Sequence, residues 1–252
     1  EHITGKTVPR LLMDKEPLSQ EQNEELENIL AAVLQGKPVH HILGYKTFYG
    51  RDFTVTPDVL IPRPETEELV EWLILSIQRT ERKVLDIGTG SGCIPITIAL
   101  ENDQTDVHAI DISESALEIA KQNCSTHKAN VRFYKANILN WKNERRLHQN
   151  WDIIVSNPPY VTQSEAPLMH ENVLDHEPGI ALFVDDDKPL VFYEQISAYA
   201  FKYLNSHGYL FFEINESLAN ETVDVVKKAG FSEIKVTKDI FGKERMLRAT
   251  KI

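Results

Sequence analysis

The sequence predicts an α/β fold with a mostly parallel seven-stranded sheet, an antiparallel last strand and a small N-terminal helical domain. Two observations carry this prediction. From Lys83 onward, short apolar runs alternate with helical patterns, which is typical of a parallel sheet covered on both faces. Only KDIFGKE separates the last two apolar runs, so no crossover helix fits between them and that pair is expected to be antiparallel.

The N-terminal part of the chain predicts one clear helix, over residues 18–35. Ser19 can cap this helix together with Gln22, three residues further on. Apolar residues recur at helical spacing through the segment, and Gly36 can end it. Its acidic residues lie on the outer face, where solvation explains them.

A hairpin and a second helix are expected next. The run KTFYGRDFTVTP, residues 46–57, alternates aromatic and β-branched residues around Gly50-Arg51-Asp52, which predicts a hairpin. In LIPRPETEELVEWLILSIQ, Pro64 can occupy the first turn of a helix over about 64–78, with acidic residues near its positive end. The expected organisation is a helical domain at 1–45, a hairpin linker at 46–57 and the main domain at 58–252.

The main domain is expected to contain the strands and helices of the sheet layer. The predicted strands cover residues 83–87, 107–111, 131–135, 152–156, 209–214, 233–237 and 245–250, and the predicted helices cover 94–101, 113–126, 188–205 and 216–229. No internal repeat or low-complexity tract interrupts this alternation.

Composition narrows the class of protein. The 252 residues are 42% hydrophobic and 26% charged, which predicts a packed core. Cys93 and Cys124 are the only cysteines, without metal-ligand spacing, so a reducing cytoplasmic location without a metal site is expected. No run approaches the ~20 apolar residues of a membrane span. A net charge of −11 opposes nucleic-acid binding and suits a basic protein partner.

A cofactor site is predicted at KVLDIGTGSGCI. Here a buried strand runs into a glycine loop and then a helix, and ligands of open α/β sheets bind at this edge. Gly88, Gly90 and Gly92 permit the sharp turn around Thr89 and the close approach of a ligand. Asp86 would repel a pyrophosphate but suits a ligand with an ammonium and a sulfonium, which indicates S-adenosyl-L-methionine.

Two further polar residues follow the next strands. Asp111 ends the second strand, where a carboxylate can accept both ribose hydroxyls of an adenosine; the alternative is a cap for the helix that follows. Asn137 follows the third strand, where it can contact the adenine amino group or act as a turn residue.

The residues expected to direct the reaction are Asn157, Pro158, Pro159 and Tyr160, directly after the fourth strand. The two prolines stiffen the segment. The Asn157 side-chain oxygen and the Pro158 carbonyl form two fixed acceptors, which suit an –NH2 group. Holding both N–H bonds aims the nitrogen lone pair at a methyl donor and favours the positive charge that develops on nitrogen. Tyr160 can pack against a flat amide or base, and Asn157 also borders the cofactor.

At these residues the chain resembles the release-factor glutamine N(5)-methyltransferases, which modify the glutamine of the Gly-Gly-Gln motif in peptide-chain release factors. The resemblance extends from about His41 to the end. Its motifs are ILGYKTFYGRDFTV, LIPRPETEELVE, DIGTGSGCI, SNPPYV, HEPGIAL and KDIFGKERMLRA. The glycine loop is common to many methyltransferases, whereas I-P-R-P-E-T combined with N-P-P-Y is selective.

The resemblance implies a class I S-adenosylmethionine methyltransferase, Rossmann-like, with strand order 3-2-1-4-5-7-6 and an N-terminal helical domain that helps to hold the release factor. It implies cofactor contacts by the 86–92 loop and Asp111, and glutamine binding by Asn157 and Pro158. Glu65 and Thr66 are expected to contribute, with helix-start stabilisation as the alternative for Glu65. Two departures stand out: residues 1–40 are short for the family's helical domain, which predicts truncation and impaired docking, and Asn137 replaces the usual Asp.

Three other functions remain as alternatives. A sister enzyme that methylates a ribosomal-protein glutamine would use the same motif. An adenine amino-group methyltransferase would need a basic groove, but the segment after Tyr160 is short and acidic at Asp185–Asp187. An interaction module with a cofactor fold would show no turnover.

Overall fold

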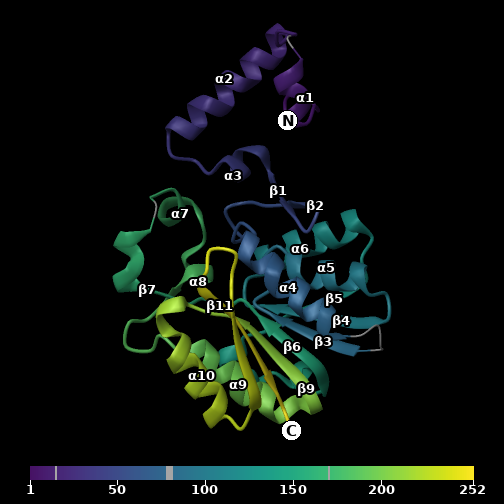
Figure 1. The fold of residues 1–252 in the computed structure, drawn as a ribbon, viewed down its shortest axis with the longest axis vertical. Coiled ribbons are helices and arrows are strands. Elements are labelled where there is room, and N and C mark those ends of the chain that lie inside the picture. The colour runs from purple at the N-terminus through teal and green to yellow at the C-terminus, as the bar shows by residue number, and fades with distance from the viewer. Residues whose placement is uncertain (15, 78–81, 170) are drawn as a thin grey trace.

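The computed structural model describes residues 1–14, 16–77, 82–169 and 171–252. Its centre is a seven-stranded sheet (Figure 1). In spatial order the strands are β10 (Ser232–Lys238), β11 (Glu244–Thr250), β9 (Leu204–Glu213), β6 (Trp151–Ser156), β3 (Arg82–Ile87), β4 (Thr105–Asp111) and β5 (Val131–Lys135). All seven predicted strands are therefore present, in the order 3-2-1-4-5-7-6.

Strand directions also follow the prediction. β3, β4, β5, β6 and β9 pair in parallel, while β11 is antiparallel to both β9 and β10. The main boundary difference is β9, which starts at Leu204 rather than Tyr209 because Leu204 pairs with Trp151 of β6 ahead of a register shift.

Helices cover both faces of the sheet (Figure 1). One layer contains α4 (Pro64–Ile77), α5 (Cys93–Glu101) and α6 (Glu114–His127), and the other contains α9 (Val191–Tyr203) and α10 (Ala219–Lys228). Neighbouring residues of one strand serve opposite layers: Phe211 packs with α4 and α5, whereas Leu210 and Phe212 pack with α9. The predicted last residue of the α4 helix, Gln78, lies outside the described residues.

The N-terminal helices stand apart from the sheet domain (Figure 1). They are α1 (Val8–Met13), α2 (Gln20–Leu34) and α3 (Val39–Leu43). The predicted start of α2 is confirmed, since Ser19 and Gln22 form a reciprocal capping box. Gly36 ends the helix as predicted, with φ 86° and hydrogen bonds from Gly36 N to Val33 O and from Lys37 N to Ala32 O.

The predicted hairpin joins the two parts, with one correction. Its strands are β1 (Tyr45–Phe48) and β2 (Arg51–Thr54), so Arg51 and Asp52 belong to a strand and the turn is Tyr49-Gly50. Both turn residues have positive φ, 48° and 73°, which is the two-residue turn that matches strand twist. The hairpin is fixed to the main domain by Asn123, whose side chain bonds both the N–H and the carbonyl of Thr54.

Several short elements have no counterpart in the sequence prediction. They are α1, α3, η1 (Ile138–Asn143), η2 (Arg145–Leu147), β7 (Val161–Thr162), η3 (Gln163–Leu168), α7 (Glu171–His176), α8 (Gly179–Leu182) and β8 (Phe183–Val184), whereas η4 (Glu216–Leu218) lies within the predicted helix at 216–229. Elements of two to six residues are too short to show a hydrophobic period. Local capping specifies some of them, as where Thr162 and Glu165 bond reciprocally at the start of η3.

Candidate active site

The candidate site lies where β3, β4 and β6 end. Ile87 is in register with Ile110 of β4 and with Ser156 of β6, so the three following loops begin side by side. Gly88 N and Thr89 N donate to Ile110 O at 2.9 and 3.0 Å, and the Ser156 hydroxyl donates to Ile87 O at 2.7 Å. These bonds fix the glycine loop and the N-P-P-Y segment to a common edge.

The glycine loop serves both the cavity and the packing of helices. Gly88, Gly90 and Gly92 all have positive φ, as the turn requires. Gly88 and Gly90 border the cavity, but Gly92 does not. A Cβ on Gly92 would lie 3.0 Å from Ile96 and 3.1 Å from Ala120, so its small size allows α5 and α6 to approach each other.

Asp86 lies beneath the loop and is fully buried. Among the described residues, no hydrogen bond of ordinary geometry reaches its carboxylate oxygens or the buried Thr89 hydroxyl, and the nearby Thr89 hydroxyl only partly opposes the rise in the Asp86 pKa. Burial raises the pKa of Asp86 to about 7. An unpaired buried carboxylate is costly, and a bound ammonium group would relieve that cost. Asp86 and Thr89 therefore fit a cationic ligand, although neither lines the cavity directly.

Asp111 is held by backbone donors on both oxygens. Its Oδ1 accepts from Ser113 N and its Oδ2 from Gly90 N, each at 2.9 Å. Burial raises its pKa, and these backbone bonds act in the opposite direction. The helix cap is Ser113 instead, whose hydroxyl accepts from Ala116 N. Asp111 is thus a preoriented acceptor at the cavity wall.

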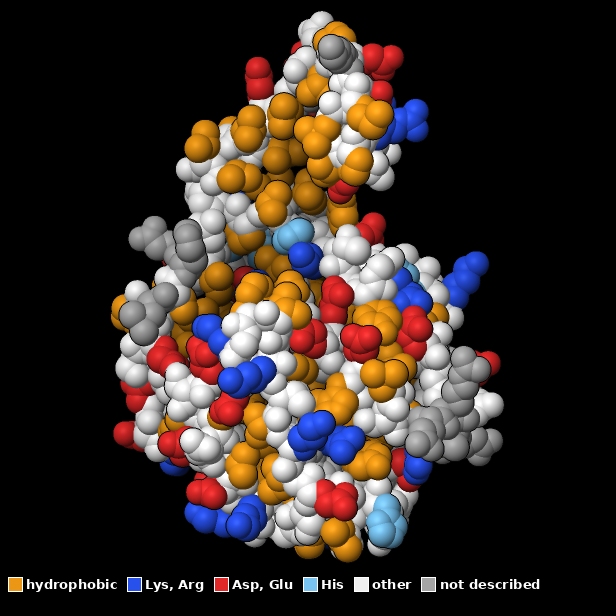
Figure 2. All heavy atoms as spheres, in the orientation of Figure 1, with side chains coloured by type: hydrophobic (Ala, Val, Ile, Leu, Met, Phe, Trp, Pro, Cys, Tyr) orange, Lys and Arg blue, Asp and Glu red, His pale blue; other side chains and the backbone are white. Residues whose placement is uncertain are grey.

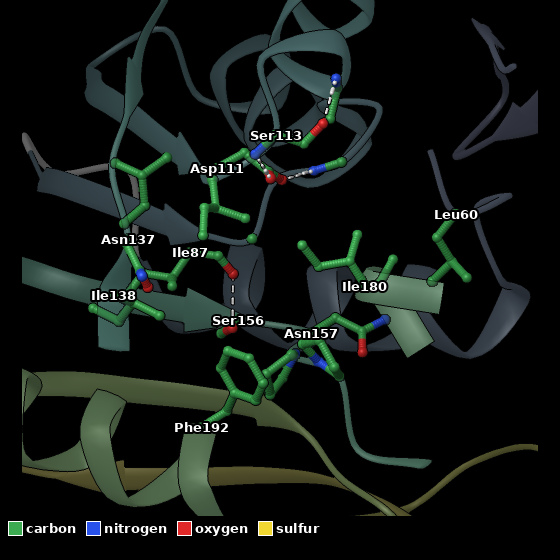
Figure 3. Close-up of a pocket in the computed structure, with 18 of the residues that line it drawn as sticks. Leu60, Ile87, Asp111, Ser113, Asn137, Ile138, Ser156, Asn157, Ile180 and Phe192 are labelled. Carbon is green, nitrogen blue, oxygen red and sulfur yellow. Dashed lines mark hydrogen bonds between the residues drawn. The ribbon is translucent and has the colours of Figure 1, made fainter. Parts of the chain in front are cut away.

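A cavity of about 220 Å³ opens between these loops. Figure 3 shows Asp111, Asn137 and Asn157 around it, together with Ile180 and Phe192. Its lining is largely apolar and includes Val59, Leu60, Ile87, Ile110, Ile112, Ile138, Leu139, Ile180 and Phe192. The sequence prediction did not single out these residues, because each is indistinguishable from a core residue in the pattern.

Asn137 lines the cavity and also acts locally. Its Oδ1 accepts from Leu139 N at 2.9 Å and caps η1. The turn function that the sequence left open is therefore present, and it uses one of the two lone pairs of that oxygen.

Asn157 and Pro158 lie between two cavities. Besides bordering the larger one, they line a second cavity of about 110 Å³ together with Arg63, Tyr160 and Glu213. Pro159 borders only the larger cavity. The Tyr160 carbonyl accepts from Asn215 Nδ2 at 3.2 Å, which fixes the end of the motif.

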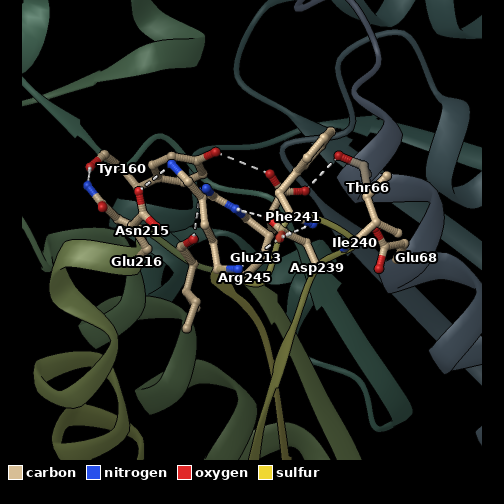
Figure 4. Close-up of polar contacts among 12 residues, drawn as sticks. Thr66, Glu68, Tyr160, Glu213, Asn215, Glu216, Asp239, Ile240, Phe241 and Arg245 are labelled. Atoms are coloured by element: carbon tan, nitrogen blue, oxygen red, sulfur yellow. Dashed lines mark hydrogen bonds and ion pairs between the residues drawn. The ribbon is translucent and has the colours of Figure 1, made fainter. Parts of the chain in front are cut away.

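The buried carboxylate of Glu213 connects the motif to α4. Its Oε2 accepts from the Thr66 hydroxyl at 2.6 Å, and its Oε1 accepts from the Tyr160 hydroxyl at 3.2 Å (Figure 4). Asn157 Nδ2 donates to the Thr66 hydroxyl at 3.3 Å. Burial raises the pKa of Glu213, while the two hydroxyls and the Arg245 charge oppose that shift.

The structure brings Thr66 rather than Glu65 to the predicted site. Neither residue lines a cavity, but Thr66 is buried and bonds both Asn157 and Glu213, whereas the adjacent Glu65 points about 100° away around the helix. Sequence reasoning missed Glu213 altogether. Its signal was an acidic residue inside the apolar run YLFFEI, since such a residue is rarely buried without a partner.

An ion pair lies beside the smaller cavity, which Arg63 lines. Glu177 is 6% exposed, accepts from Ile61 N at 3.1 Å and pairs with Arg63 at 2.7 Å. This connects the segment before α4 to the loop before α8. Among the described residues no cluster of side chains suited to a metal ion is found, and no described helix has the length and apolarity to cross a bilayer.

Comparisons with known proteins agree with this geometry. Residues 66–176 match the methyltransferase small domain and residues 1–44 match the PrmC N-terminal domain. A release factor glutamine methyltransferase of Flavobacterium psychrophilum is 43% identical over 96% of this chain and 86% of its own length. A methyltransferase from Pyrococcus furiosus is similar in structure, with TM-score 0.59 and 21% identity over 89% of this chain and 98% of that one. A Thermus thermophilus 16S rRNA methyltransferase, solved with AdoMet and guanosine, has TM-score 0.58 and 16% identity over 82% of this chain and 50% of that one.

The sheet order, the glycine loop with Asp86 and Asp111, and the N-P-P-Y segment define a class I S-adenosylmethionine-dependent methyltransferase. The extent of the similarity to curated relatives is more specific. The chain belongs to the release factor glutamine methyltransferase family.

Proposed function

We propose that this enzyme transfers the methyl group of S-adenosylmethionine to the side-chain amide nitrogen of the glutamine in the Gly-Gly-Gln motif of peptide-chain release factors. The position of Asn157 and Pro158 between two adjoining cavities carries the proposal. Family membership supports the substrate class, because the curated relatives are named release factor glutamine methyltransferases.

The larger cavity would hold the cofactor. Asp111 would accept the ribose hydroxyls, since each of its oxygens has one backbone donor and a further lone pair. The Asp86 carboxylate, beneath the glycine loop, would attract the ammonium group of the cofactor. Ile112, Ile138 and Leu139, which line the cavity, would pack against the adenine. When bound, the cofactor supplies a methyl group activated by a sulfonium charge.

The smaller cavity would hold the substrate amide. An amide nitrogen is a weak nucleophile because its lone pair is delocalised into the carbonyl. Asn157 Oδ1 and the Pro158 carbonyl would accept its two N–H bonds and so fix the direction of the lone pair. The same two acceptors favour the positive charge that develops on nitrogen. Arg63 and Tyr160 line this cavity.

The N-terminal helices would dock the protein substrate. None of the described residues of α1, α2 and α3 is buried, and large apolar side chains such as Leu12, Met13 and Leu34 are 82%, 82% and 87% exposed. Figure 2 shows hydrophobic side chains gathered along this N-terminal part of the molecule. An apolar surface of this kind, beside the sheet domain, fits contact with a folded protein.

The test is a methyl-transfer assay with labelled S-adenosylmethionine. The enzyme is incubated with a purified release factor, and separately with the same factor carrying Gln→Ala in its Gly-Gly-Gln motif. Label on the first factor alone supports the proposal. Label on neither factor, while calorimetry detects cofactor binding, would contradict it. A ribosomal protein and a single-stranded DNA then test the two alternative substrates.

A further inference from the structure

Three side chains form one directed chain of hydrogen bonds behind the N-P-P-Y segment. Asn157 Nδ2 donates to Thr66 Oγ1 at 3.3 Å, and Thr66 Oγ1 donates to Glu213 Oε2 at 2.6 Å. Thr66 is 3% exposed and Glu213 is 1% exposed, so water does not compete at the inner bond. The three residues come from the loop after β6, from α4 and from β9, which are far apart in the sequence.

The number of protons available on each group fixes the donor-to-acceptor direction of this chain of hydrogen bonds. A threonine hydroxyl has a single proton, and the ionised Glu213 carboxylate, which the Arg245 charge and the Tyr160 hydroxyl favour, can only accept. Thr66 must therefore donate to Glu213 and use its oxygen as an acceptor. Only the –NH2 end of the Asn157 amide can face that oxygen, so Oδ1 must be turned the other way.

We propose that Thr66 and Glu213 are positioning residues that fix the orientation of the Asn157 amide, so that its oxygen rather than its nitrogen faces the substrate. The inference rests on the proposed function, in which that oxygen holds the glutamine –NH2. If the Asn157 amide were flipped, its –NH2 would face the –NH2 of the substrate, and two donors cannot bond each other. The hydrogen bond that orients the glutamine nitrogen would then be lost. The two ends of an amide have nearly the same shape, so the surrounding hydrogen bonds decide which end faces the substrate.

Kinetics supply the first test. Thr66→Val keeps the side-chain volume and removes the hydroxyl. We expect kcat for the release factor to fall about 10- to 100-fold, which corresponds to the loss of one buried hydrogen bond and its orientation. The Kd for S-adenosylmethionine should stay within about threefold, and Thr66→Ser should restore kcat to within about threefold of wild type. Thr222→Val is the matched control, because the buried hydroxyl of this α10 residue donates to Leu218 O, one turn earlier, and lies outside the site.

A spectroscopic readout separates this inference from the proposed function. With ¹⁵N-labelled asparagine, the Asn157 side-chain –NH2 is assigned from its loss in Asn157→Asp. We expect slow hydrogen exchange of that group in wild type, and faster exchange with a shifted resonance in Thr66→Val and Glu213→Gln. Unchanged exchange and kcat in Thr66→Val, or equal loss of kcat in Thr66→Val and Thr66→Ser, would overturn the role. A wild type that labels no release factor would defeat the proposed function alone, since the exchange measurement still decides the hydrogen-bond chain.

Discussion

The catalytic edge of the sheet and the N-terminal helices differ in which side chains they bury and which they expose. At the edge, Asp86, Glu213 and Ser156 are buried polar groups. Hydrogen bonds between separate elements hold two of them, because Ser156 donates to β3 and Glu213 accepts from α4. In α1 and α2, by contrast, no described residue is buried and large apolar groups face outward. The first region is organised before a ligand arrives, whereas the second leaves apolar side chains exposed.

This contrast predicts different consequences for substitutions in the two regions. At the catalytic edge, a change should alter the chemical step or cofactor affinity for any substrate. In the N-terminal helices, it should alter only the use of a large protein substrate. The measurements below separate these effects.

The largest effect is expected for Asn157→Ala. Removing one of two acceptors that stabilise developing charge typically costs on the order of 10²–10³ in kcat. Cofactor affinity should stay within about threefold, since Asp111 and the glycine loop are unaltered. Single-turnover kinetics and calorimetry measure the two quantities, with Asn140→Ala at an exposed position as the control. A parallel loss of both quantities would contradict the assignment of Asn157 to the amide.

The next effect concerns Asp111. Asp111→Ala removes a carboxylate that is held by Gly90 N and Ser113 N. The substitution should therefore raise the Kd for S-adenosylmethionine about 10- to 100-fold. Asp106→Ala, at a partly exposed carboxylate near the other end of β4, is the comparison. Equal affinity for wild type and Asp111→Ala in calorimetry would remove Asp111 from the cofactor site.

Much of this edge could be predicted from sequence because strand endings are local signals. The strand KVLDI, its glycine loop, Asp111 and N-P-P-Y each follow an apolar run, and parallel strands bring their ends together. Thr66 and Glu213 could not be assigned a partner in this way, because their contact spans 147 positions and depends on how α4 lies against β9. The short elements between Tyr160 and Val191 were missed for a different reason, since they contain too few residues to show a period.

A moderate effect is expected from the ionisation of Asp86. Burial raises its pKa to about 7, against an ordinary value of about 3.9. Between these values the folded protein binds a proton that the unfolded chain has lost, so the stability of the cofactor-free protein should decrease as pH rises towards 7 and level off above it. The slope is at most about 1.4 kcal/mol per pH unit. Cofactor affinity should follow the opposite trend, because the ammonium group needs the ionised form.

Thermal unfolding of the cofactor-free protein from pH 5 to pH 8 measures this linkage. Asp86→Asn should be more stable than wild type at pH 8, by several degrees in Tm, and the difference should shrink towards pH 5. A constant difference across that range would show that Asp86 does not titrate there. Asp52→Asn, at an exposed position in the hairpin, controls for the general effect of removing one negative charge.

The smallest effect, and the one that tests the second region, is expected from Leu34→Asp in α2. Leu34 is 87% exposed, so the substitution removes almost no buried area and should leave Tm and cofactor affinity unchanged. If α2 docks the release factor, kcat/KM for the intact factor should fall about 10-fold, as expected when a charge replaces an apolar contact. A short peptide containing Gly-Gly-Gln should be methylated equally by both enzymes, because it cannot reach α2. Asn28→Asp adds the same charge to α2 at an exposed polar position and should have little effect. Equal loss on the peptide and the intact factor would mean that α2 acts on the catalytic edge, and the contrast between the two regions would then fail.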